Sequence, residues 1–152
     1  MGMMDDKAIL VDTNVLLSAT APHRPLHRAA LTVLNDWPNQ GIVLTASVQV
    51  LREYLAVATR PVEVNGLNLG TSDALANVTA FRGRMRLLVD GEPAWDRLRT
   101  LIATYDCKGK QIHDANLVAS ALTAGVAKLV TANVGDFKRF AADLEVIDLA
   151  AL

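Results

Sequence analysis

Four acidic side chains are spaced along the sequence so that they could share one site for a divalent cation. Asp12 directly follows the apolar run 8–11, and Asp136 follows a later apolar run by a short loop. In open α/β sheets, ligands bind beyond the carboxyl ends of the strands, which is where these two side chains would lie. The other two acids, Glu53 and Asp114, fall within stretches of helical periodicity.

Asp114 lies on the apolar side of its predicted helix, one turn before Leu117 and Val118. A carboxylate that points toward a core is costly unless it is hydrogen-bonded, neutralised or bound to a metal. Ser120 falls on the opposite face of the same helical wheel, where we expect contact with water. Asp114 is therefore the acid whose position most strongly indicates a function.

Glu53 lies at the border of the apolar arc of its own predicted helix, from which its carboxylate could reach over the rim of a cleft. Gln49 and Arg52 fall on the polar half of that wheel, where we expect both to be solvated. Solvated border residues share the pattern of Glu53, so this residue taken alone does not decide between the two interpretations.

The four acids taken together indicate a shared cation site, which none of them indicates alone. Asp12, Asp114 and Asp136 could each simply cap or begin a helix. Neighbouring parallel strands would, however, bring Asp12 and Asp136 together, with Asp114 and Glu53 entering from the flanking helices. Four carboxylates in one pocket raise each other's pKa values unless a cation is bound, and Mg²⁺ or Mn²⁺ suits an all-oxygen site. Such a site predicts hydrolytic cleavage of a phosphodiester.

The elements that must position these acids alternate between short strands and helices. The predicted strands cover residues 8–11, 42–44, 86–89, 128–130 and 145–147. The predicted helices cover a stretch after residue 12 and then about 25–37, 47–58, 71–84, 93–105 and 113–125. This alternation predicts an α/β three-layer sandwich with a mostly parallel five-stranded central sheet.

The composition of the 152 residues bounds the class of protein. About half are hydrophobic and a fifth are charged, so we expect one globular domain over residues 1–152. The formal charge of −1 excludes a globally basic chain, and any nucleic-acid contact needs a local patch. A single cysteine, Cys107, excludes a disulfide framework. No membrane span and no apolar signal core at the start MGMMDDK are found, so we expect a cytoplasmic protein with no membrane contact.

At these residues the sequence resembles the PIN-domain ribonucleases, and among them the VapC-type toxins of bacterial toxin–antitoxin pairs. The resemblance covers nearly the whole chain and rests on four segments in order: ILVDTNVLL, VLREYLAVATRP, IHDANLVASAL and LVTANVGDF. It implies a PIN-like fold and a metal-dependent endoribonuclease. In that family, Asp12, Asp114 and Asp136 would bind Mg²⁺ or Mn²⁺, and Glu53 would hold a metal or its water. Polar positions that would support the site by hydrogen bonding are Thr13, Thr131 and Asn133.

The resemblance also implies partners. It implies an RNA substrate, such as a tRNA or rRNA loop, whose cleavage inhibits translation. It also implies a small antitoxin protein whose tail occludes the site, and it implies that the protein is a homodimer. The loop 60–71 lies outside the family's metal-binding motifs. For RNA contact, Lys138 and Arg139 are expected nearest the site because they follow Asp136 closely. Further basic candidates are Arg82, Arg84, Arg86, Lys108 and Lys110.

Two alternatives of other classes stay open. The chain could be a non-catalytic protein-interaction module whose acids cap helices or hold a structural cation. It could also be a DNA-directed nuclease or a phosphatase that uses the same acids. Phosphate-binding motifs of the GxGxxG and GxxxxGK[ST] kinds are absent from the sequence, which disfavours nucleotide binding of those types.

Overall fold

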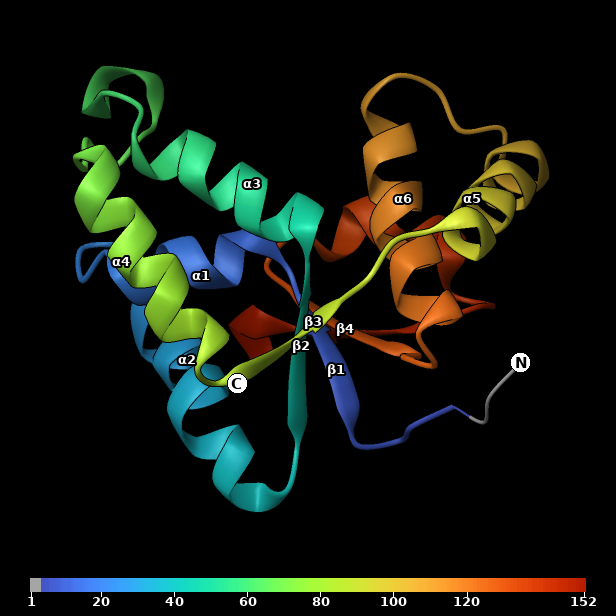
Figure 1. Cartoon of the computed structure of the whole chain (residues 1–152), viewed down its shortest axis with the longest axis horizontal. Helices are drawn as coiled ribbons and strands as arrows, with labels where there is room; N and C mark the ends of the chain where they lie inside the picture. The colour runs from blue at the N-terminus through green and yellow to red at the C-terminus, as the bar shows by residue number, and fades with distance from the viewer. Residues whose placement is uncertain (1–3) are drawn as a thin grey trace.

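The computed structural model describes residues 4–152 and arranges five short strands in one parallel sheet (Figure 1). The strands are β1 (Ala8–Val11), β2 (Val43–Ser47), β3 (Met85–Leu88), β4 (Lys128–Thr131) and β5 (Glu145–Asp148). Their order is β3-β2-β1-β4-β5, and every neighbouring pair is parallel. The chain proceeds outward from β1 to β3 and then returns to β4, so the switch in strand order lies between β1 and β4.

Helices cover both faces of the sheet, with α1 to α4 on one side and α5 and α6 on the other (Figure 1). The α-helices are α1 (Thr13–Thr20), α2 (His27–Leu31), α3 (Val48–Ala58), α4 (Thr71–Arg82), α5 (Glu92–Tyr105) and α6 (Lys110–Thr123). A π-helical turn at Thr32–Asp36 follows α2, and the 3₁₀ turns are Trp37–Gln40, Val62–Val64, Val134–Phe140 and Leu149–Ala151. The three-layer α/β sandwich with a five-stranded parallel sheet is thus confirmed.

The central strand β1 is apolar along its whole length because helices cover both faces of the sheet there (Figure 1). All four residues of β1 are buried, whereas every residue of the edge strand β5 is exposed or half-buried. Buried parallel strands require such uninterrupted apolar runs. The pairing of Leu10 with Leu129 and of Val11 with Val130 brings the carboxyl ends of β1 and β4 side by side.

Two helices begin directly at the carboxyl ends of strands, which fixes where the site can form. The side chain of Asp12 accepts a hydrogen bond from the backbone N–H of Thr13 and caps α1. Ser47 caps α3 in the same way by accepting from the N–H of Val50. Such caps satisfy backbone donors that the helix leaves free. No helix in residues 4–152 is long and apolar enough to cross a membrane, and the first three residues of the start MGMMDDK lie outside this range.

The structure shifts several predicted boundaries. The stretch predicted as one helix over 25–37 is α2, a π-helical turn and a 3₁₀ turn, which ends at Gly41 with φ of +82°. Helix α6 begins at Lys110 rather than near His113, after Gly109, whose φ is +57°. The earlier start places Lys110 about one helical turn ahead of Asp114.

Candidate active site

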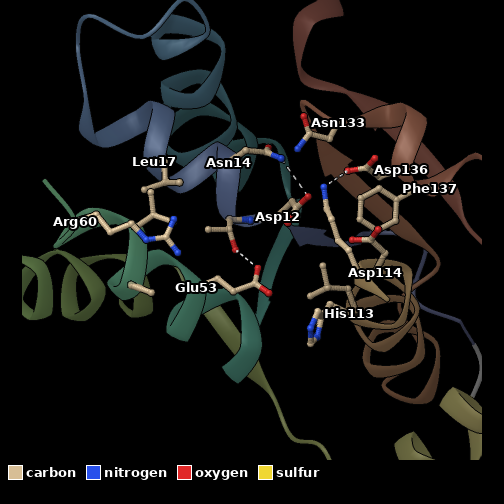
Figure 2. Close-up of a pocket in the computed structure, with 15 residues that line it drawn as sticks. Asp12, Asn14, Leu17, Glu53, Arg60, His113, Asp114, Asn133, Asp136 and Phe137 are labelled. Atoms are coloured by element: carbon tan, nitrogen blue, oxygen red, sulfur yellow. Dashed lines mark hydrogen bonds and ion pairs between the residues drawn. The ribbon is translucent and has the colours of Figure 1, made fainter. Parts of the chain in front are cut away.

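A pocket of about 410 Å³ lies at the carboxyl ends of β1 and β4, where the strand order switches (Figure 2). All four predicted acids line it. Asp12 follows β1, Glu53 comes from α3, Asp114 from α6, and Asp136 from the 3₁₀ turn after β4. The structure therefore brings together, from four separate elements, the side chains that the sequence singles out.

Asp12 is buried and held by three hydrogen-bond donors. It accepts from the backbone N–H of Thr13 at 2.8 Å, from Thr131 Oγ1 at 2.8 Å and from Asn14 Nδ2 at 3.2 Å. Burial raises the pKa of Asp12, an effect that the hydrogen bonds from Thr131 and Thr13 oppose and the charge of Glu53 reinforces. The hydrogen bonds thus fix the orientation of the Asp12 carboxylate, although burial and the charge of Glu53 still disfavour its ionised form.

Asn14 ties the Asp12 carboxylate to the loop after β4. Its Nδ2 donates to Asp12 and, at 3.1 Å, to Thr131 Oγ1, and its Oδ1 accepts from the N–H of Ala132 at 2.9 Å. Thr131 Oγ1 also accepts from the N–H of Asn133, which lines the pocket. Asn14 was not among the residues expected at the site, although a polar side chain two residues after an aspartate that ends a strand was the available signal.

Glu53 is oriented by donors from two helices. One carboxylate oxygen accepts from Thr13 Oγ1 at 3.2 Å, and the other accepts from Gln49 Nε2 at 3.0 Å. Gln49 also donates to the backbone oxygen of His113 and accepts from Asn116 Nδ2, so it joins α3 to α6. The expectation that Gln49 is solvated is wrong because α6 covers that side of α3, and only 3% of its surface is exposed.

The like charges of Asp114 and Asp136 interact, and Lys110 is the lysine near them. Burial, reinforced by the charge of Asp136, raises the pKa of Asp114 to about 6, although the charge of Lys110 acts to lower it. Asp12 and Glu53 add smaller effects that raise the same pKa. Lys110 Nζ lies 3.6 Å from Asp136 Oδ2. The pocket therefore holds more negative charge than its cations balance.

The raised pKa of Asp114 predicts a stability that falls as the pH rises. Between its unperturbed value of 3.8 and about 6, the folded state binds more protons than the unfolded state, so the free energy of unfolding decreases across this window. Asp114→Asn removes this loss. Because Asp114 is partly exposed, solvent screens the repulsion, and we expect a gain of ~1 kcal/mol at neutral pH and none near pH 4.

Thermal unfolding of the wild type and of Asp114→Asn, at neutral pH and near pH 4, checks this expectation. Asp96→Asn is the matched control, because Asp96 is an exposed aspartate of α5 outside the pocket. A midpoint for Asp114→Asn below that of the wild type at both pH values would contradict the proposed repulsion.

The donors around the pocket suit a hard divalent cation. Carboxylate oxygens from four residues face it, as Mg²⁺ and Mn²⁺ prefer. The side-chain oxygens of Thr13, Asn14 and Asn133 and the imidazole of His113 also line it. As the side chains are placed, no three or more His, Cys, Asp or Glu residues within 4–152 lie close enough together to hold a metal ion. Closing such a shell requires side-chain rotation, and for Asp136 it requires exchange of its contact with Lys110.

The basic residues that line the pocket are Lys110 and Arg60. Lys138 and Arg139, expected nearest the site, follow Asp136 in sequence but do not line the pocket. Arg60 entered the sequence analysis only as the start of a loop. It lies two residues past the end of α3, so the helical periodicity around Glu53 does not reach it and no sequence signal placed it at the pocket.

By its fold and its pocket, the chain is an α/β domain that gathers carboxylates where the strand order switches between β1 and β4. The model of the PIN domain family matches residues 9–143, and this chain belongs to that family. The resemblance drawn from the four sequence segments is thereby confirmed.

Individual relatives agree with this assignment. The chain is 29% identical over 136 residues to "Ribonuclease VapC24" of Mycobacterium tuberculosis, covering 86% of this chain and 89% of that protein. The structure of VapBC-1 from nontypeable Haemophilus influenzae matches with a TM-score of 0.69 and 18% identity, covering 94% of this chain and 98% of that one. Mycobacterium tuberculosis VapC20, described as a "Sarcin-Ricin loop cleaving toxin", matches with a TM-score of 0.63 and 18% identity, covering 90% and 95%.

Proposed function

We propose that this chain is a metal-dependent endoribonuclease and the toxin of a toxin–antitoxin pair. The observation that carries the proposal is the convergence of four acids from separate elements on one pocket of a PIN-domain chain. The name of the relative VapC24 as a ribonuclease supports the activity. The likeness to VapBC structures supports an antitoxin partner for this chain.

The proposed metal ligands are Asp12, Asp114 and Asp136, with Glu53 as a further ligand or as the group that orients a water. A bound Mg²⁺ or Mn²⁺ supplies a Lewis acid for the phosphodiester and lowers the pKa of coordinated water. Asp12 is held for this role by the donors Thr131 and Asn14.

Glu53 is the acid best placed to orient an attacking water. Its two oxygens already accept from Thr13 and Gln49, so its carboxylate direction is set before a substrate binds. Preorganised groups of this kind avoid reorganisation during the reaction. Gln49 acts through Glu53 and is proposed as a positioning residue.

The proposed substrate is RNA, cut within a structured loop such as that of a tRNA or rRNA, with inhibition of translation as the result. Three Phe, two Tyr and two Trp make no aromatic stacking platform, so recognition would depend on phosphates and RNA shape. We further propose that the protein acts in the cytoplasm as a homodimer, with residues 1–152 of each copy forming one functional unit.

Incubation of the purified protein with tRNA and total RNA tests the activity. We expect cleavage with Mg²⁺ or Mn²⁺ and none with EDTA, because the four carboxylates repel the scissile phosphate when no cation is bound. Asp12→Asn, purified identically, controls for contaminating nucleases. Single-stranded DNA of matched sequence is the parallel substrate.

Each result of this assay decides between the candidate functions. Metal-dependent cutting of RNA in preference to DNA supports the proposal. Equal or faster cutting of DNA would replace it with a DNA-directed nuclease. Failure to cut any nucleic acid would favour the protein-interaction module.

A further inference from the structure

A second pocket, of about 470 Å³, continues the acidic pocket away from α6. It is walled by α1, the segment before α2, the end of α3 with the loop that follows it, and the loop after β4. The two pockets share lining residues Asn14, Leu17, Val57, Arg60 and Asn133. A ligand long enough to fill both therefore meets one continuous surface.

The charge of the second pocket is opposite to that of the first. Its lining contains Arg24 and Arg60 and no aspartate or glutamate. Within residues 4–152, neither arginine lies within ion-pair distance of a carboxylate. The Nε of Arg24 is buried and has no hydrogen-bond partner among those residues. A buried donor left unpaired costs free energy, and an unpaired guanidinium matches the geometry of a phosphate.

Both arginines extend from fixed backbone. The N–H of Arg24 donates to the oxygen of Ala21, and the N–H of His27 donates to the oxygen of Arg24. The oxygen of Arg60 accepts from the N–H of Asn68 at 2.8 Å.

Gly66 packs directly on the backbone of Arg60. A Cβ at Gly66 would lie 2.1 Å from the oxygen of Arg60, closer than any side chain tolerates. The loop after α3 thus folds back onto its own start and fixes the base of Arg60. Preorganisation of this kind reduces the entropy lost when a ligand binds.

We propose that Arg24 and Arg60 bind a backbone phosphate of the RNA that flanks the scissile phosphate. This assignment rests on the proposed ribonuclease function. A polyanion must cross a pocket of four acids, and cations on both sides of that pocket offset the repulsion. Lys110 lies on the α6 side, and Arg60 and Arg24 lie on the other. The RNA strand accordingly runs from Lys110 across the acids into the second pocket.

Binding of RNA without cleavage tests the proposal directly. The probe is a fluorescein-labelled, mixed-sequence single-stranded RNA of about 12 nucleotides, within the usual length of single-strand sites. The protein carries Asp12→Asn so that the probe stays intact, and Arg24→Gln or Arg60→Gln is added. Arg99→Gln is the matched control, because Arg99 is exposed on α5 and lines neither of the two pockets.

Each pocket substitution is expected to weaken binding about five- to tenfold, and to reduce the slope of log affinity against log salt concentration by about 0.7. Arg99→Gln is expected to change neither the affinity nor the salt slope. Arg60→Lys retains the charge, so it should restore the salt slope while regaining only part of the affinity. Thermal midpoints of all variants establish that each one is folded.

Cleavage kinetics in the otherwise wild-type protein supply a second measurement. Arg24 lines only the second pocket, away from the acids, so Arg24→Gln should raise KM and leave kcat nearly unchanged. Arg60 also lines the acidic pocket, so Arg60→Gln should raise KM whatever its effect on kcat. If the wild type cuts RNA while both variants keep its affinity and salt slope, the subsite is overturned and the ribonuclease function stands. If the wild type cuts no RNA, the function itself fails, whatever the binding data show.

Discussion

Asp114→Asn is expected to lower kcat/KM for RNA cleavage by at least about a hundredfold, because even indirect changes around metal ligands cost up to that much. The substitution removes a proposed metal ligand and leaves the side chain's shape almost unchanged. It should not unfold the protein, since burial and neighbouring charges alone account for its raised pKa, with no hydrogen bond among the causes. Activity and stability are therefore expected to change in opposite directions.

Asp12→Asn separates this effect from structural damage. Asp12 caps α1 and accepts from Thr131 and Asn14, so its replacement by an amide removes acceptors as well as charge. We expect a comparable loss of activity, together with a loss of stability of ~1 kcal/mol from the disrupted hydrogen bonds. An Asp114→Asn protein that unfolds, or one that retains wild-type cleavage, would make Asp114 a structural residue.

Mn²⁺ or Mg²⁺ is expected to raise the midpoint of thermal unfolding of the purified protein. A ligand that binds only the folded state stabilises it by mass action, by ~3 kcal/mol at a hundredfold excess over Kd, or about 5–10 °C for a chain of this size. The rise should vanish in the double variant Asp12→Asn/Asp114→Asn. Calorimetry or dye-monitored melting at several metal concentrations measures it.

The size of this metal effect should depend on pH in a defined direction. Protons compete with the cation for Asp114, whose pKa is about 6, so the metal-induced rise should shrink as the pH falls below that value. A midpoint that stays constant up to millimolar metal at neutral pH would contradict a cation site in the free protein. It would favour the interaction-module alternative.

The sequence by itself determines the sheet and the meeting of the acids. An uninterrupted apolar run of strand length can be buried only when helices cover both faces, which predicts the central strand β1. The shorter apolar pair Leu129–Val130 indicates β4. Asp12 and Asp136 then come together because neighbouring parallel strands end at the same edge of the sheet. The periodicity around Asp114 gives the direction of its carboxylate, since that direction is a property of one helix.

Tertiary structure decides which polar side chains are covered and which basic ones reach the pocket. Ser120, expected to contact water, is buried because α5 packs on α6, and its hydroxyl donates to Asp90 at 2.6 Å. Gln49 is buried between α3 and α6 in the same way. Arg24 and Arg60 meet at one pocket although they belong to different loops. A helical wheel describes one element's own faces, whereas burial and convergence depend on which other elements pack against it.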